Sequence, residues 1–205
     1  MPTPATDRLL PNRRLRSLMS AMQDVIGRNG LNASLRLAGL TRFINALPAD
    51  DDPTALRASE YAMLIQAIET QYGNGARGQL TRVGHVSFNY LLAAEPLAWR
   101  WIALTNQVLP SAQRLRRTLG QLAKQLAEPG EGITVYLNDG RLIFSDTVSD
   151  NTAGRTTLTA NEICWLTAGQ LRAGCAWATS KDYDVVEVTC RAKGDMHCNF
   201  EIVEL

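Results

Sequence analysis

The amino-acid sequence predicts an α+β fold in which an N-terminal helical bundle packs on a small antiparallel sheet. Two observations lead to this prediction. Apolar residues recur at three- and four-residue steps through the first two-thirds of the chain, which is typical of amphipathic helices. The last third holds a strong hairpin signal at Asn138-Asp139-Gly140 and two later strand patterns. We therefore expect a helical front part followed by a sheet that includes one further helix.

The individual elements follow from the apolar spacing and from the breaks between apolar stretches. Helices are expected at residues 12–26, 32–47, 54–72, 77–92, 97–106 and 111–126. Breaks are expected at 28–30, 48–53, 73–75 and 130–132, where glycine, asparagine and proline gather. Strands are expected at 133–137, 141–145, 184–190 and 197–203. Between the strand pairs, Thr159 and Glu162 fit a capping box that opens a helix, and Gly174 can end it.

Composition limits the classes of function. The chain of 205 residues is 45% hydrophobic, which allows a sizeable core. Its formal net charge of +1 gives no broad electrostatic reason to bind nucleic acid. The basic runs 13–16 and 116–117 are interpreted as solvated helix faces, with anion or partner sites as the alternative. No apolar stretch is long enough for a membrane span, and residues 1–12 do not resemble a signal peptide. We expect a cytoplasmic protein with reduced thiols.

Three cysteines and one glutamate near the C-terminus form a candidate metal site. Cys190 and Cys198 lie on the two strands of the expected closing hairpin, at equal distances from Gly194. Glu187 precedes Cys190 on the same strand, and Cys164 lies on the preceding helix. Three thiolates and one carboxylate provide the four ligands of a closed, structural zinc site. The sequence therefore predicts a zinc ion that ties the helix to the hairpin.

The spacing raises one objection to this site. Side chains alternate along a regular strand, so Glu187 and Cys190 should point to opposite faces. Both can bind one ion only if the strand bulges or ends near Val188 and Thr189. Two buried thiols or a disulfide at Cys190 and Cys198 remain as alternatives. Cys175 has no partner at a sensible spacing and is interpreted as a core residue.

At the cysteine-rich end, the segment 187–202 resembles the end of 4-vinyl reductase domains, with Cys190, Gly194, Cys198 and Phe200 in the expected order. The segments 72–77 and 82–84 resemble that family's glycine-rich helix junction, and 27–40 its N-terminal helices. The resemblance extends to phenol-sensing domains, haem-NO-binding-associated domains and TRAPP subunits. In the phenol sensors, three cysteines and a glutamate at this spacing hold zinc, which implies that Cys164, Glu187, Cys190 and Cys198 do so here.

The resemblance also implies how the chain is organised. It implies N-terminal helices at 1–48 that form a homodimer, followed by a ligand-binding domain at 49–205 with the zinc site at its end. The apolar positions Leu15, Leu18, Met19 and Met22 are expected to be exposed for this dimer. The expected function is a binding module for a small hydrophobic ligand of aromatic or tetrapyrrole-like character. An enzyme or accessory subunit of (bacterio)chlorophyll metabolism is the alternative, and a tethering role like that of TRAPP subunits is the third.

The predicted pocket lies between residues 77–106 and the hairpin at 133–145. The sequence has no dinucleotide fingerprint and no catalytic triad at an informative spacing, which favours binding over catalysis. Each pocket candidate has a plain core role as its alternative. Trp99 and Trp101 cannot both face inward on one helix, so one of them should be exposed or at a dimer contact. The candidates for ligand contact are His85, Phe88, Tyr90, Trp99, Phe144 and Trp165, with Trp101 and Tyr136 as further aromatic residues of these segments.

Overall fold

The computed structural model of the chain describes residues 7–51, 54–127 and 132–205, so residues 52–53 and 130–131 of the expected breaks lie outside the described residues. The fold is α+β, as the sequence predicts. The helices are α1 (Asn12–Leu37), α2 (Ala58–Tyr72), α3 (Ala76–Ala94), α4 (Pro96–Asn106), α5 (Ser111–Leu126) and α6 (Trp165–Thr179). The strands are β1 (Leu9–Pro11), β2 (Thr54–Arg57), β3 (Ile133–Asn138), β4 (Arg141–Asp146), β5 (Tyr183–Thr189) and β6 (Cys198–Glu204).

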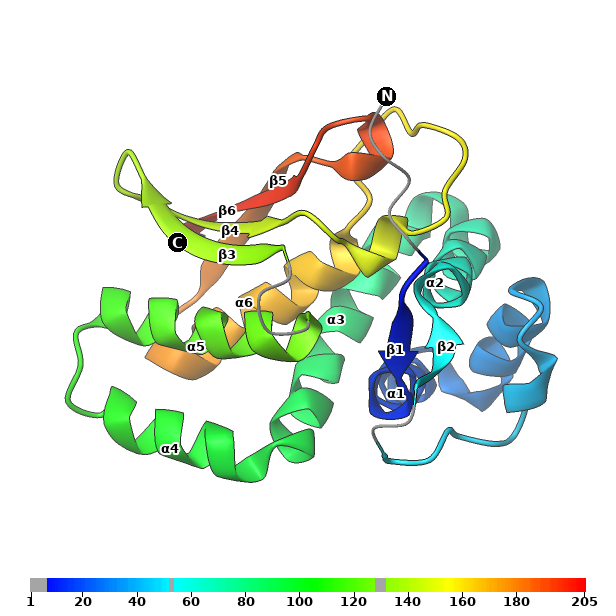
Figure 1. Cartoon of the computed structure of the whole chain (residues 1–205), viewed down its shortest axis with the longest axis horizontal. Coiled ribbons are helices and arrows are strands. Elements are labelled where there is room, and N and C mark those ends of the chain that lie inside the picture. Colours follow the sequence, from blue (N-terminus) through cyan, green and yellow to red (C-terminus); the bar gives the residue numbers. More distant parts are fainter. Residues whose placement is uncertain (1–6, 52–53, 128–131) are drawn as a thin grey trace.

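The strands form two sheets of unequal size. The short strands β1 and β2 pair with each other, and the main sheet has the order β3-β4-β6-β5 with antiparallel neighbours. Figure 1 shows α5 and α6 below this main sheet and α4 below α5. The central strands β4 and β6 bring Phe144 opposite Phe200, and both rings are fully buried. The sheet and its helices therefore form one core.

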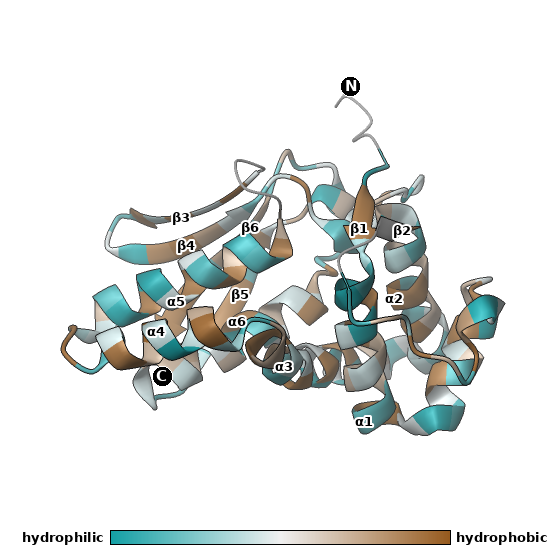
Figure 2. Cartoon of the chain, turned by 60° about the horizontal axis from the view of Figure 1, so that its bottom comes forward, coloured by the Kyte–Doolittle hydropathy of each residue, from teal (hydrophilic) through white to brown (hydrophobic). Residues whose placement is uncertain are grey.

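A second core lies among the N-terminal helices. It is built from α1, α2, β2 and the first half of α3, whereas the second half of α3 belongs to the core under the sheet. Trp165, the first residue of α6, packs against both cores. Each helix in Figure 2 carries both hydrophilic and hydrophobic residues, as expected of helices that bury one face. The two helices α3 and α6 thus join the N-terminal part to the sheet.

Two glycines allow α3 and α6 to cross in direct backbone contact. A Cβ atom on Gly84 would lie 2.0 Å from the Leu166 carbonyl oxygen, and one on Gly169 would lie 2.1 Å from the Thr81 carbonyl oxygen. Any larger residue would force the helices apart, since such distances are far below van der Waals contact. This contact fixes the position of the first turn of α6, which directly follows Cys164 of the candidate metal site.

The N-terminal helices differ from the sequence expectation in their ends. The first two expected helices are one element, α1, with a kink at Gly27, where the backbone has a φ of 73°. The helix then ends at Leu37 rather than at residue 47. Gly39 has a φ of 71°, and the Leu40 amide donates to the Leu35 carbonyl at 2.8 Å. This is the Schellman motif, which ends a helix by satisfying its last carbonyl groups.

Three other helix ends were predicted wrongly. Residues 54–57, expected in a helix, form strand β2, and α2 begins at Ala58. The helix expected to open at Thr159 begins only at Trp165, because the preceding loop is held by other contacts. The Thr159 amide donates to the Ala192 carbonyl at 2.8 Å, and Glu162 pairs with Lys193, so no capping box forms. The same helix continues past Gly174 to Thr179.

The apolar stripe of α1 is buried within the chain, which corrects the expectation that it is exposed. Leu15, Leu18, Met19 and Met22 are at most 1% exposed and pack in the N-terminal core. The homodimer stays a prediction, but this stripe no longer supports it. The same core includes residues on both sides of the expected boundary at 48 and 49, so that division also stays a prediction. Among the described helices, none is long and apolar enough to cross a membrane.

Candidate metal centre and the adjoining cleft

A bulge in β5 brings Glu187 and Cys190 to the same side of the sheet. Glu187 pairs with Phe200 and Thr189 with Asn199, so Val188 is the extra residue and the register shifts there. A bulge of this kind places two residues opposite one and reverses the alternation beyond it. The condition that the sequence set for a shared site is therefore met. Cys164 is the residue directly before α6, so it lies at the end of the preceding loop and not within the helix.

The four candidate ligand atoms form a tight, buried group. All lie within 4.8 Å of one another, and the three sulfur-bearing side chains are fully buried. The Cys164 sulfur is 3.9 Å from that of Cys190 and 3.6 Å from that of Cys198. All four cysteines of the chain are free thiols, so the disulfide alternative at Cys190 and Cys198 is not formed. These four residues can hold one metal ion.

The surrounding backbone supports the group with hydrogen bonds. The Cys164 amide donates to Glu187 Oε2 at 2.9 Å, and the Arg191 amide donates to the Cys198 sulfur at 3.4 Å. The Cys190 amide donates to Asp195 Oδ2 at 2.8 Å, which fixes the turn between β5 and β6. The sequence analysis did not single out Asp195, although its position directly after Gly194 is a common turn signal.

The electrostatics of the group favour a bound cation. Burial, together with the nearby Cys190, raises the pKa of the Glu187 carboxyl to about 8. Hydrogen bonds from the Cys164 and Cys198 thiols lower the pKa of Cys190, while the pKa of Cys164 is raised well above its usual value. A negative charge on Cys190 is thus stabilised, and this charge repels a second negative charge on Cys164 or Glu187. In addition, Glu187 Oε1 is buried without a hydrogen-bond partner among the described residues. A divalent cation would supply the missing positive charge and the missing partner.

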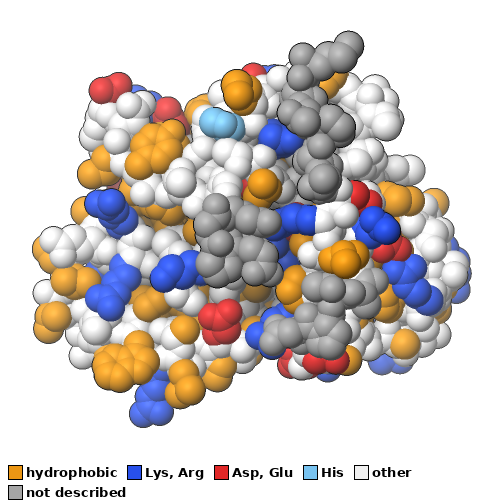
Figure 3. All heavy atoms as spheres, in the orientation of Figure 1, with side chains coloured by type: hydrophobic (Ala, Val, Ile, Leu, Met, Phe, Trp, Pro, Cys, Tyr) orange, Lys and Arg blue, Asp and Glu red, His pale blue; other side chains and the backbone are white. Residues whose placement is uncertain are grey.

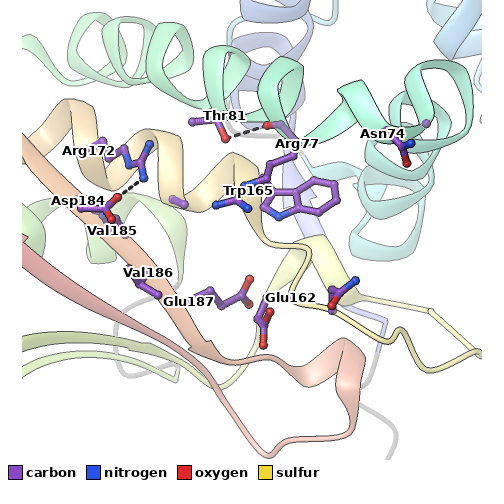
Figure 4. A pocket seen from close by; sticks show the side chains of 13 residues that line it. Asn74, Arg77, Thr81, Glu162, Trp165, Arg172, Asp184, Val185, Val186 and Glu187 are labelled. Carbon is purple, nitrogen blue, oxygen red and sulfur yellow. Dashed lines mark hydrogen bonds and ion pairs between the residues drawn. The ribbon is translucent and has the colours of Figure 1, made fainter.

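A cleft of about 650 Å³ adjoins the metal centre. Its lining comes from the start of α3, the loop before α6, α6 itself and β5, and it includes Trp165 and Glu187. Figure 4 shows the Trp165 indole between α3 and the carboxylates of Glu162 and Glu187. Glu187 is therefore shared between the cleft and the candidate metal centre. Further lining residues are Asn74, Arg77, Thr81, Asn161, Arg172 and Asp184.

Most charges in the cleft already have partners. Arg172 pairs with Asp184, and Glu162 accepts a hydrogen bond from Lys193 at 2.5 Å. Arg77 is exposed and has no ion-pair partner among the described residues. Within the described part of the chain, the cleft lining therefore offers a flat aromatic surface at Trp165 and an unpaired cation at Arg77. No local spacing in the sequence marks Arg77 as a cleft residue, because segments far apart in the sequence form the cleft.

Three of the six candidate ligand contacts lie in the core. Phe88, Trp99 and Phe144 are at most 3% exposed. Phe88 and Trp99 stack edge to face at 5.5 Å between ring centroids, and Trp177 stacks on Trp99 at 5.4 Å. These rings occupy space expected to form the pocket, which agrees with the core role that the sequence left open. Their role as ligand contacts stays a prediction.

The other candidates have different surroundings. His85 is exposed on α3, and the Tyr90 hydroxyl donates to Asp24 at 2.6 Å, which raises the pKa of Tyr90. Trp165 lines the cleft beside the metal centre. The expectation that only one of the neighbouring tryptophans faces inward is confirmed, since Trp99 is buried and Trp101 is 68% exposed.

The fold places the chain in the class of α+β proteins with the H-NOX architecture. Comparisons with protein families and with curated proteins found no match, so the resemblance to 4-vinyl reductase domains stays an interpretation. Solved H-NOX structures match over nearly the whole chain. One is an H-NOX protein from S. oneidensis in the Fe(II)NO ligation state, with 13% identity, a TM-score of 0.54 and coverage of 93% of this chain and 98% of that one.

Two further structures agree with this placement. An oxygen-binding H-NOX domain related to soluble guanylate cyclases has 11% identity, a TM-score of 0.55 and coverage of 92% and 91%. A structure from work on haem redox potential and porphyrin distortion has 10% identity, a TM-score of 0.60 and coverage of 95% and 99%. At this identity the likeness establishes the fold. It agrees in fold with the haem-NO-binding-associated part of the relationship that the sequence predicts.

The described lining of the cleft offers no axial ligand for a haem iron. Haem iron needs a histidine, cysteine, methionine or tyrosine directed into a space that holds the ring. The cleft beside the metal centre has no such side chain in its lining. The sequence has two histidines: His85 is exposed, and His197 is half-buried directly before β6. Cys175 is buried in the core under the sheet and does not line the cleft.

Proposed function

We propose that this chain is a small-molecule-binding domain held together by a structural zinc ion at Cys164, Glu187, Cys190 and Cys198. The observation that carries the zinc assignment is the spacing of the sulfur atoms. Zn–S bonds of about 2.3 Å at tetrahedral angles place two sulfur atoms about 3.8 Å apart. The sulfur atoms here are 3.6 Å and 3.9 Å apart. Soft thiolates select zinc over magnesium and calcium, which prefer oxygen ligands.

A zinc ion at this position would be structural, because four protein ligands leave no open coordination position for a substrate. It would join the loop before α6 to the turn between β5 and β6. Metal binding of this kind contributes directly to the free energy of folding. We therefore expect about one equivalent of zinc by elemental analysis of protein purified without added metal. The assignment would be contradicted if the metal-free protein had the same melting temperature as the zinc-containing protein.

Two cysteine variants separate the metal site from ordinary core packing. Cys190→Ser removes a ligand and should lower the free energy of unfolding by several kcal/mol, with loss of the zinc. Cys175→Ser is the matched control, since Cys175 is equally buried but lies outside the metal group. It should cost less and keep the zinc. Equal zinc contents in the two variants would refute the ligand assignment.

For the ligand, we infer a small aromatic molecule with a negatively charged edge, bound in the cleft beside the metal centre. The Trp165 indole offers a stacking surface, and Arg77 can pair with a carboxylate or phenolate. The solved neighbours include an oxygen-binding domain and an Fe(II)NO complex, which supports a ligand-binding role for the fold without identifying the ligand of this chain. The predicted contacts Phe88, Trp99 and Phe144 could reach a ligand only if the core opened.

A thermal-shift screen of phenols, aromatic carboxylates, porphyrins and fatty acids tests this proposal. A ligand that binds only the folded state raises the melting temperature as its concentration exceeds the dissociation constant. Arg77→Gln should weaken binding of an aromatic carboxylate by about tenfold or more, because a charged hydrogen bond is lost. Arg82→Gln, on the same helix and equally exposed, is the control. The proposal fails if no aromatic class stabilises the protein, or if both variants bind equally well.

A further inference from the structure

Helix α4 is apolar on two opposite faces. Trp99 and Ile102 point into the core under the sheet, as expected for an amphipathic helix. The outer face is also apolar, which is unusual for a helix that faces water. Its residues recur at steps of four, three and four and so lie within one narrow sector of the helix and its continuation. We define them as the α4 stripe, which consists of Leu97, Trp101, Leu104 and Val108, exposed by 74%, 68%, 53% and 84%.

All charged residues of the helical hairpin that carries this stripe, residues 96–127, are basic. Between Glu95 and Glu128 the sequence contains no acidic residue over residues 96–127, although the whole chain is nearly neutral. The basic residues of this segment are Arg100, Arg114, Arg116, Arg117 and Lys124, and all but the half-buried Arg114 are exposed. Figure 3 shows basic and hydrophobic side chains intermingled at the lower left, where Figure 1 places α4 and α5.

We propose that the α4–α5 hairpin docks on the surface of an anionic lipid membrane. The α4 stripe would enter the boundary between headgroups and acyl chains, and the exposed arginines and lysine would lie among the negatively charged headgroups. A membrane interface accepts both features at once, since apolar burial and attraction to anionic lipids act together. Trp101 lies in the middle of the stripe, and tryptophan prefers the interfacial region. No residue of the metal centre or the cleft takes part.

The charge argues against the two other occupants. In a symmetric dimer through this face, the same patch would meet itself, so Arg100 and Arg116 would face like charges of the second copy. Nucleic acid would satisfy the cations but would leave the α4 stripe in water, because phosphate contacts require no apolar surface. An anionic bilayer is complementary to both the charge and the apolar stripe.

Vesicle co-sedimentation tests the proposal with the full chain. We expect binding to vesicles that contain phosphatidylglycerol, and little binding to vesicles of phosphatidylcholine alone or in high salt. Trp101→Ser with Leu104→Ser should reduce the partition coefficient at least tenfold. Arg116→Gln with Arg117→Gln should reduce it by about 25-fold, at about fivefold for each cation near the surface. Because these side chains are exposed, the variants should fold as the parent does.

Two further measurements make the result decisive. Binding should shift the tryptophan emission to shorter wavelength, and Trp101→Phe should abolish the shift, since Trp101 is the tryptophan on the stripe. Leu158→Ser with Arg36→Glu is the matched control, because both residues are exposed on other surfaces, and it should bind as the parent does. Absence of binding to the anionic vesicles, or equal binding by all variants, would overturn the proposal. A solution dimer that Trp101→Ser dissociates would overturn it in favour of a second copy.

Discussion

The direct backbone contact between α3 and α6 makes Gly84→Ala a sharp test of the structure. The new Cβ atom would lie 2.0 Å from the Leu166 carbonyl oxygen and 3.1 Å from the Gln170 nitrogen. Both atoms belong to the backbone of α6, so no side-chain rotation relieves the clash. The helices would have to separate by roughly 1 Å or more to restore van der Waals contact.

The magnitude follows from two opposing effects. Overpacking in a well-packed interior costs about 1–3 kcal/mol, and a clash with rigid backbone lies at or beyond the upper end of that range. Replacing glycine by alanine inside a helix contributes about 1 kcal/mol in the opposite direction. We therefore expect Gly84→Ala to lower the free energy of unfolding by about 2–4 kcal/mol. Gly78→Ala, on the same helix with open space around it, should raise it by up to about 1 kcal/mol.

Urea unfolding of both variants, followed by circular dichroism, measures the difference. Leu166 lies two residues after Cys164, so displacement of α6 should also loosen the metal centre. We expect Gly84→Ala to release the proposed zinc ion to a colorimetric chelator faster than either the parent or Gly78→Ala. If the two variants have equal midpoints and slopes, α3 and α6 do not cross in contact, and the reasoning fails.

Three further predictions concern buried polar groups. Asp150→Asn should cost about 3–5 kcal/mol in urea unfolding, because Arg8 and Arg14 both pair with this buried carboxylate; a cost below that of a surface ion pair would contradict this. Burial raises the pKa of Asp146 to about 6, so its ionisation destabilises the folded state as pH rises from about 4 to 6. Asp146→Asn should thus be more stable than the parent by up to about 3 kcal/mol near pH 8 and by about half as much near pH 5, and a pH-independent difference would disprove the assignment. Finally, Cys175 should react with a thiol reagent only after unfolding, because burial raises its pKa to about 12. Cys175→Ser is the control, and rapid labelling of Cys175 in the native parent protein would contradict its burial.

The sequence by itself predicted the strands of the main sheet and the four residues that the structure brings together as a candidate metal site. The turn at Asn138-Asp139-Gly140 needs positive φ, and the structure has it at both Asp139 and Gly140. The strands β5 and β6 begin and end within one residue of the prediction. The spacing of Glu187 and Cys190 even required a bulge between them, because a regular strand alternates its side chains. These features depend on local backbone geometry, which short stretches of sequence encode.

Tertiary structure decided what each apolar surface contacts. The periodic pattern of Leu15 and Met22 defines a buried face, but it does not distinguish a second copy from α2 and α3 of the same chain. The Gly84–Gly169 crossing joins residues far apart in the sequence, and neither glycine lies in a turn that would mark it. The start of α6 depends on the hydrogen bond between Thr159 and Ala192, which outweighs the local capping signal. These contacts join residues far apart in the sequence, so the spacing of residues within a short segment does not predict them.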